Sequence, residues 1–211
     1  CAIEWCEDDD ILELANGCIC CTVADDFLPT LTKLLDRETP PDHIVIETSG
    51  LALPQPLLRA FTWPEVKARV TVDGVVTVID ARAVADVRFA NDEAAVKAQQ
   101  AADESRDHES PLAELFEDQL SCADLVVVSK SDLVSEAELA SVKQTVDNER
   151  RAAATVITSG ARKPPVNVLL GVTAAPETDA AARRSHHDHH HATPHDDGDQ
   201  AHHHHDPHGQ G

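Results

Sequence analysis

Residues 125–132 read Leu-Val-Val-Val-Ser-Lys-Ser-Asp, four apolar residues followed at once by four polar ones. A short apolar run rich in β-branched residues is typical of a strand buried on both faces of a parallel sheet. In open α/β sheets, ligands bind beyond the carboxyl ends of the strands. Ser129, Lys130 and Asp132 are therefore candidate ligand-binding residues, and the alternative is a turn that begins a helix with Asp132 as its cap.

The rest of the chain alternates strand and helix patterns. Further strands are expected at Ile11–Leu14, Ile44–Ile46, Val72–Ile79 and Thr155–Ile157. Helices are expected over residues 22–37 and 82–104, from Pro111 onward, and over 136–151 after the capping box Ser135-Glu136-Ala137-Glu138. This alternation predicts an α/β fold, a mainly parallel sheet with helices on both faces.

A second strand end carries an acid and a glycine. Ile44–Ile46 is followed by Glu47 and, three residues later, by Gly50. In P-loop nucleotidases an acid at this place lies near Mg²⁺, and the glycine lets the backbone approach the γ-phosphate. Glu47 and Gly50 are thus candidate catalytic residues, and a strand followed by a polar turn is the alternative.

Three thiols fall within four residues at Cys18, Cys20 and Cys21. On an extended segment Cys18 and Cys20 point to the same face, and a bend near Gly17 would bring Cys21 toward them. Such a set suits zinc, cobalt or copper(I). Redox activity and simple packing are the alternatives.

The sequence changes character at residue 173, where apolar periodicity stops. Residues 186–211 hold all but two of the 13 histidines and have no Lys or Arg. We expect a domain over residues 1–172 and a disordered tail over 173–211 that binds metal weakly, or serves only as a solvated linker. The expected tail ligands are His186, His187, His189, His190, His191, His202, His203, His204 and His205.

The charge and composition exclude several functions. The net charge of −21 disfavours nucleic acids and anionic membrane surfaces. The sequence contains no run of 18 apolar residues, the length that a membrane-spanning helix needs, and it shows no secretory signal. The cysteine spacing does not resemble a disulfide framework, which favours the reducing cytoplasm.

These motifs, in this order, resemble the CobW family of metal-handling P-loop GTPases, related to HypB and UreG, and particularly its cobalamin-biosynthesis branch. The resemblance covers about residues 1–170 and depends on Cys18-Ile19-Cys20-Cys21 together with Glu47-Thr48-Ser49-Gly50-Leu51-Ala52. GTPases commonly use Asn-Lys-x-Asp to read guanine, so the resemblance implies that role for Lys130 and Asp132. Ser129 replaces the usual Asn, which is expected to weaken guanine preference.

The resemblance also implies GTP, Mg²⁺ and either Co²⁺ or Zn²⁺, with a metal-receiving client such as the cobaltochelatase. The Gly-x-x-x-x-Gly-Lys-Ser/Thr motif of the family does not occur in these 211 residues. We expect it upstream of Cys1, and a further domain beyond Gly211, so that the GTPase domain is incomplete at its N-terminus.

Two functions remain open from the sequence. The first is a GTP-hydrolysing metallochaperone, in which nucleotide and metal tighten each other's binding. The second is a metal store or buffer that uses the thiols and histidines without nucleotide turnover. A phosphate-binding motif in the upstream coding sequence would favour the first.

Overall fold

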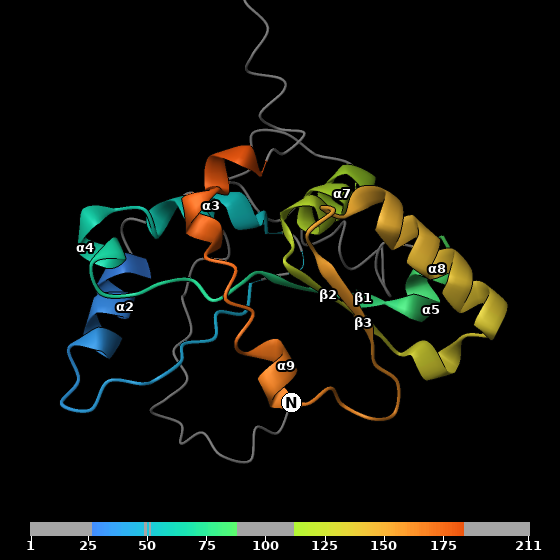
Figure 1. Ribbon diagram of the computed structural model, residues 1–211, viewed down its shortest axis with the longest axis horizontal. Helices are drawn as coiled ribbons and strands as arrows, with labels where there is room; N and C mark the ends of the chain where they lie inside the picture. The colour runs from blue at the N-terminus through green and yellow to red at the C-terminus, as the bar shows by residue number, and fades with distance from the viewer. Residues whose placement is uncertain (1–26, 49, 51, 88–111, 184–211) are drawn as a thin grey trace, which may run out of the picture.

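The computed structural model describes residues 27–48, 50, 52–87 and 112–183 of the chain. Three strands form a parallel sheet in the order β1 (Val76–Asp80), β2 (Leu125–Ser129) and β3 (Thr155–Thr158). Beside the sheet lie α5 (Ala81–Ala85), α7 (Leu112–Cys122) and α8 (Glu136–Glu149). On the other side of the view lie α2 (Leu28–Leu35), α3 (Pro54–Ala60) and α4 (Pro64–Lys67) (Figure 1). The predicted α/β fold with a parallel sheet is confirmed.

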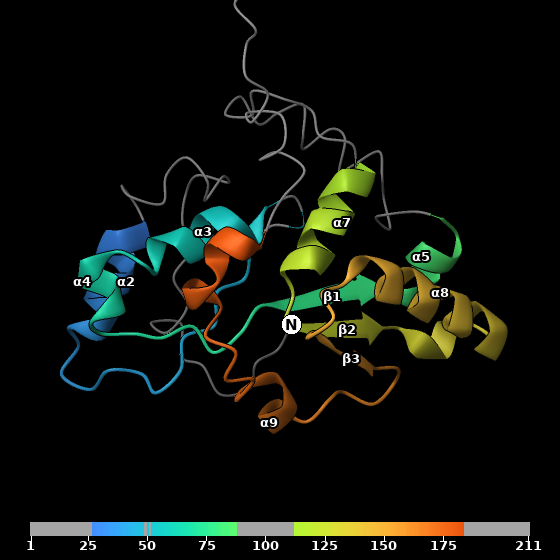
Figure 2. The same cartoon turned by 45° about the horizontal axis from the view of Figure 1, so that its top comes forward.

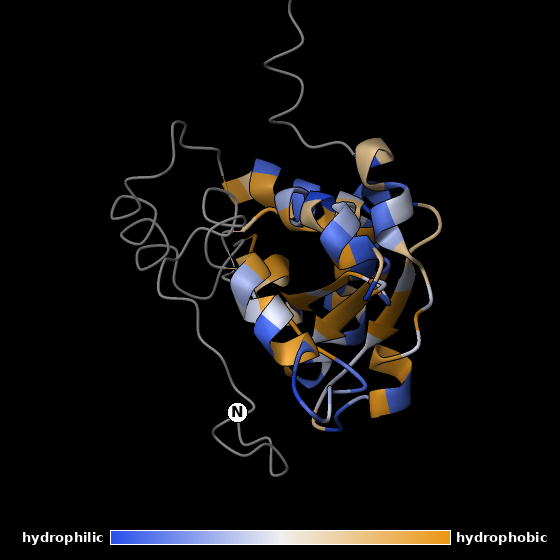
Figure 3. Cartoon of the chain, turned by 90° about the vertical axis from the view of Figure 1, so that its left-hand side faces the viewer, coloured by the Kyte–Doolittle hydropathy of each residue, from blue (hydrophilic) through white to orange (hydrophobic). Residues whose placement is uncertain are grey.

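The central strand β2 is the most buried part of the sheet. Its residues Leu125 to Val128 are at most 5% exposed, as expected for a strand covered on both faces. One face packs against α7 and α8 in a cluster that contains Ile79, Val126, Val128, Phe116, Leu120, Val142 and Val146. The hydropathy colouring shows the strands as mainly apolar (Figure 3).

The predicted capping box begins α8. The Ser135 hydroxyl accepts a hydrogen bond from the Glu138 amide at 3.3 Å, and the Glu138 carboxylate accepts one from the Ser135 amide at 2.8 Å. These bonds satisfy backbone donors that the first helical turn leaves free. Helix α7 (Leu112–Cys122) lies within the helix expected from Pro111 onward.

A second apolar cluster joins α2, α3 and α4. Its buried members are Phe27, Leu31, Ala60, Phe61 and Val66, and the Phe27 and Phe61 rings meet edge to face with centroids 5.6 Å apart. A proline opens both α3 and α4, where the missing backbone N–H costs no helical bond. Neither helix was predicted, because each is too short to show helical periodicity.

The expected buried strand at residues 44–46 is not formed, and that prediction was wrong. Ile44 and Ile46 pack against the second cluster, while Val45 is 78% exposed. A strand needs a neighbouring backbone for its ladder. Among the described residues, no strand pairs with this segment.

The strand expected over Val72–Ile79 begins only at Val76. The Val75 amide donates instead to the Asp124 carboxylate, at 2.9 Å, and the Val75 carbonyl accepts from the Asp124 and Leu125 amides. The Asp73 carboxylate accepts from the amides of residues 171–173. The backbone before Val76 is therefore occupied by loop contacts.

Helix lengths also differ from the expectations. The helix α2 ends at Leu35, and α5 ends at Ala85, where Val87 adopts a left-handed φ of 57°. The helix expected over residues 82–104 therefore forms at its start but does not continue past Ala85. The expected strand at 11–14 and the remaining parts of the expected helices, in residues 22–26 and 88–104, lie outside the described residues.

Residues 171–183, which we call the C-terminal strap, run back along the domain. The strap contains η4 (Pro176–Thr178) and η5 (Ala180–Ala182), and it follows α9 (Val166–Leu169). Its Ala180 packs with Leu58 of α3 and Cys122 of α7. Contrary to the expectation of disorder from residue 173, these residues pack against the domain, and the rest of the expected tail lies outside the described part.

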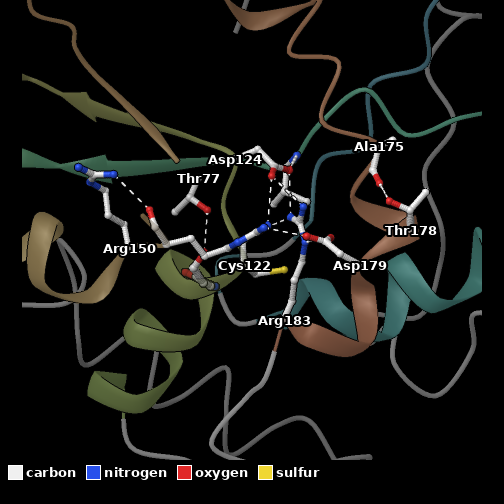
Figure 4. A network of polar contacts seen from close by, with 11 residues as sticks. Thr77, Cys122, Asp124, Arg150, Ala175, Thr178, Asp179 and Arg183 are labelled. Carbon is white, nitrogen blue, oxygen red and sulfur yellow. Dashed lines mark hydrogen bonds and ion pairs between the residues drawn. The ribbon is translucent and has the colours of Figure 1, made fainter. Parts of the chain in front are cut away.

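The strap ends in a buried guanidinium. Arg183, 3% exposed, donates to both carboxylate oxygens of Asp124 at 2.8 and 2.9 Å and to the Cys122 carbonyl at 2.6 Å (Figure 4). It also donates to Asp179 at 2.6 Å. Burial alone would lower the pKa of Arg183, but the hydrogen bonds to Asp124 and Asp179 raise it above its ordinary value. The Arg183 guanidinium therefore keeps its positive charge at neutral pH.

Replacing Arg183 with Met should lower the free energy of unfolding by about 3–5 kcal/mol, because the substitution removes a buried partner of Asp124. The matched control is Arg69→Met, which breaks an exposed pair with Asp36 and should cost about 1 kcal/mol or less. Urea unfolding of both variants measures the difference. Equal losses would show that the strap does not stabilise the domain.

Candidate functional site

The carboxyl ends of β1 and β2 lie side by side and carry the residues expected to bind ligand. Asp80 and Ser129 are paired in register at these ends, and the arrowheads of the strands point toward α5 and α8 (Figure 2). The Ser129 hydroxyl donates to the Ile79 carbonyl at 2.7 Å. That hydroxyl is therefore engaged with the neighbouring strand.

Lys130 is held in place by Asp80. Its Nζ lies 2.6 Å from Oδ2 of Asp80, whose other oxygen caps α5 by accepting from the amides of Arg82 and Ala83. The Lys130 backbone is in the left-handed region, with φ 54° and ψ 31°. The ammonium group of Lys130 is thus paired with the carboxylate at the end of β1.

Asp132 lies in η3 (Ser131–Leu133), immediately beyond β2, and its side chain is exposed. Among the described residues, no hydrogen bond or ion pair occupies its carboxylate. The Ser131 amide donates to the Ser159 carbonyl at 3.1 Å, and the Ser159 amide donates to the Val128 carbonyl at 2.8 Å. Asp132 therefore presents two acceptor oxygens from a turn that β2 and β3 hold together.

The sequence reasoning missed the turn after β3. A Cβ on Gly160 would lie 3.0 Å from Oδ1 of Asp132 and 3.2 Å from its Cβ. A side chain at residue 160 would therefore crowd Asp132 unless Asp132 moved by a few tenths of an ångström. The signal that could have found it is the small-residue run Ser159-Gly160-Ala161 directly after a strand, next in space to Ser131-Asp132.

The expected catalytic residues lie in a separate segment. Glu47 is exposed, and the Gly50 and Ala52 carbonyls accept from Nε2 of Gln119 at 2.9 and 3.1 Å. A Cβ on Gly50 would meet nothing within 4 Å, and its φ is not left-handed. Local packing and conformation therefore do not require glycine there. In the contacts of the described residues, neither Glu47 nor Gly50 touches Ser129, Lys130 or Asp132.

The expected metal ligands cannot be placed. Cys18, Cys20 and Cys21 and the nine tail histidines lie outside the described residues. Within the described ranges, no group of three or more His, Cys, Asp or Glu side chains could hold a metal ion. Burial raises the pKa of the Cys122 thiol to about 11, so Cys122 stays protonated at neutral pH and is a poor metal ligand.

The part of the chain that the structure describes has no helix of the length and apolar character that a bilayer span requires.

Residues 3–157 match the model of the CobW/HypB/UreG nucleotide-binding domain. The chain belongs to the CobW/HypB/UreG family. The recognition made from the motifs is thereby confirmed, and with it the P-loop-GTPase-like fold class. The match includes the strand ends at Asp80 and Ser129 and the segment of Glu47 and Gly50.

Curated relatives of this family member include two proteins named zinc chaperone CobW. The one from Sinorhizobium sp is 55% identical over 172 residues, covering 82% of this chain and 49% of the relative. The one from Pseudomonas aeruginosa is 48% identical, covering 78% and 44%. A zinc-regulated GTPase metalloprotein activator 1 from Schizosaccharomyces pombe is 31% identical, covering 79% and 36%. The chain thus spans about half the length of the two CobW relatives.

Replacing Gly160 with Ala should weaken guanine-nucleotide binding by about fivefold, or about 1 kcal/mol. The added methyl group requires Asp132 to move by a few tenths of an ångström, and Asp132 is the acceptor that the sequence leads us to expect at the base. The measurement is GTP affinity in the full-length protein, with the neighbouring exposed substitution Ala161→Ser as control. Unchanged affinity in Gly160→Ala would show that Asp132 does not contact the base.

Proposed function

We propose that the protein is a GTP-dependent metallochaperone that binds Zn²⁺ and passes it to a client. The observation that carries this proposal is the pre-positioned edge formed by Ser129, Lys130 and Asp132. Ser129 pairs in register with Asp80 of β1, the Lys130 side chain pairs with Asp80, and the Ser131 amide binds the Ser159 carbonyl, so this turn is held in place before any base binds. Membership of the CobW/HypB/UreG family supports a nucleotide as the ligand.

Guanine suits this edge better than adenine does. The two Asp132 oxygens would accept from N1–H and the N2 amino group of guanine, and adenine offers neither donor in that arrangement. The Lys130 stem, fixed by Asp80, would lie along the plane of the base. A site built to accept two hydrogen bonds discriminates against an analogue that cannot donate them, because the bound analogue would leave both acceptors unpaired.

The phosphates would be held by residues outside the described part of the structure. Two features of the described structure support this proposal: residues 44–46 lack a ladder partner, and Val76 and Val78 of β1 are 38% and 66% exposed. A further strand that carries a phosphate-binding loop would fit between such edges.

Glu47 is the proposed ligand of Mg²⁺, since an exposed carboxylate supplies the hard oxygen ligand that this ion prefers. Bound Mg²⁺ would neutralise phosphate charge.

The names of the relatives support Zn²⁺ as the ion that the protein delivers. Two CobW relatives carry the name zinc chaperone, and thiolates of Cys18, Cys20 and Cys21 would suit Zn²⁺ or Co²⁺. We propose that GTP binding tightens this thiol site and that hydrolysis releases the ion, a linkage that is reciprocal. Delivery of Co²⁺ to a cobaltochelatase in the cytoplasm is the alternative cargo and client for the same mechanism.

Replacing Asp132 with Asn should lower GTP affinity about tenfold or more in the full-length protein. The amide exchanges one acceptor for a donor that faces the guanine donors, and a lost contact of this kind costs about 1–3 kcal/mol. Asp42→Asn, an exposed substitution in a loop, is the control and should leave affinity unchanged. Equal competition by ATP and GTP in the unmodified protein would refute the assignment of guanine.

Metal titrations would separate the thiol site from the histidines. Changing Cys18, Cys20 and Cys21 together to Ser should abolish the GTP-linked tight binding of Zn²⁺, whereas deleting residues 186–211 should lower only the total capacity. Binding by the tail should fade as the pH falls through about 6.5, because protonated imidazole cannot ligate. Metal-bound thiolates resist protonation, so the tight site should persist to lower pH.

The outcomes of these titrations distinguish the candidate functions. Loss of the GTP-linked event on tail deletion would assign the specific site to the histidines instead of the thiols. Metal binding that is the same with and without GTP, in protein that also fails to hydrolyse GTP, would favour the storage function. Parallel titrations with Co²⁺ would test that alternative cargo.

A further inference from the structure

One glutamine connects the candidate catalytic segment to the rest of the domain. Nε2 of Gln119, in α7, donates to the Gly50 carbonyl at 2.9 Å and to the Ala52 carbonyl at 3.1 Å. A primary amide has two hydrogens on this nitrogen, and each is used by one carbonyl. Gln119 is separated from these partners by more than 60 residues, so the contact is tertiary and not a local turn.

Gln119 is itself fixed relative to the sheet. Its backbone carbonyl lies in the last turn of α7, where helical carbonyls lack an intrahelical partner, and it accepts from the Thr77 hydroxyl of β1 at 3.1 Å. Its neighbours Leu115, Phe116 and Leu120 are buried on the same helix. A continuous set of contacts thus runs from β1 through Gln119 to Gly50 and Ala52.

We propose that Gln119 is a positioning residue for GTP hydrolysis. It sets where the peptide groups of Gly50 and Ala52 lie relative to the sheet, and thereby where Glu47 and Gly50 stand relative to the nucleotide. This inference rests on the proposed function, and it adds a residue that no motif in the sequence indicates. A misplacement of about 1 Å in a catalytic segment can cost about a hundredfold in rate.

The contacts also predict which kinetic constant depends on Gln119. The edge that would bind the base is held by bonds to Ile79, Asp80 and Ser159, and none of these bonds involves Gln119. Water can replace the amide at Gly50, because that residue is exposed. Loss of the amide therefore affects the position of the segment much more than nucleotide affinity or folding.

The test uses full-length protein with Gln119→Met, which keeps the length of the side chain but removes both donors, and Gln119→Glu, which places a carboxylate against two carbonyls. The matched control is Gln144→Met on the exposed surface of α8. We expect kcat for GTP to fall about ten- to hundredfold in both Gln119 variants. GTP affinity and the unfolding midpoint should stay close to those of the control.

Each result decides the question. Unchanged kcat in Gln119→Met would overturn the role of Gln119 while leaving the proposed function intact. A parallel loss of kcat, GTP affinity and stability would mean that Gln119 only supports the fold, and would overturn it as well. An unmodified protein that binds GTP without hydrolysing it, with or without metal and Mg²⁺, would refute the proposed function itself.

Discussion

The carboxylate of Asp124 is the constraint on which the described domain depends. It stands at the start of β2, is 10% exposed, and accepts from Arg183, Arg151 and the Val75 amide. Its backbone amide binds the Val75 carbonyl, and its carbonyl accepts from the amide of Thr155. One residue thus fixes the beginnings of all three strands. A buried charge of this kind is tolerable only because its partners are complete.

The consequence appears at the opposite end of the sheet. Because the strands start in register, Asp80 and Ser129 finish as neighbours, and the turn at Ser159 reaches Ser131. Side chains that would bind a base are therefore placed by contacts some distance from any ligand. Such pre-organisation is what allows a short polar turn to act as a specific site.

Regular, locally encoded elements could be predicted from the sequence, and elements set by distant contacts could not. β2 and α8 follow from an apolar run and a capping box, which are properties of neighbouring residues. The failure at residues 44–46 has the opposite cause, since an apolar run cannot show whether a ladder partner exists. The roles of Gly160 and Gln119 depend on which residues meet in the fold, and a single sequence carries no such information.

Lys130 has a left-handed backbone conformation that a lysine adopts only at a cost in stability. Its φ of 54° lies in a region that residues other than glycine and asparagine enter at a cost of about 1 kcal/mol or more. Asparagine or glycine would relieve that strain, yet either would remove the long stem and the ammonium group that pairs with Asp80. At this position, folding stability and the proposed binding of a base favour different amino acids, so the lysine fits a trade-off settled in favour of that proposed role.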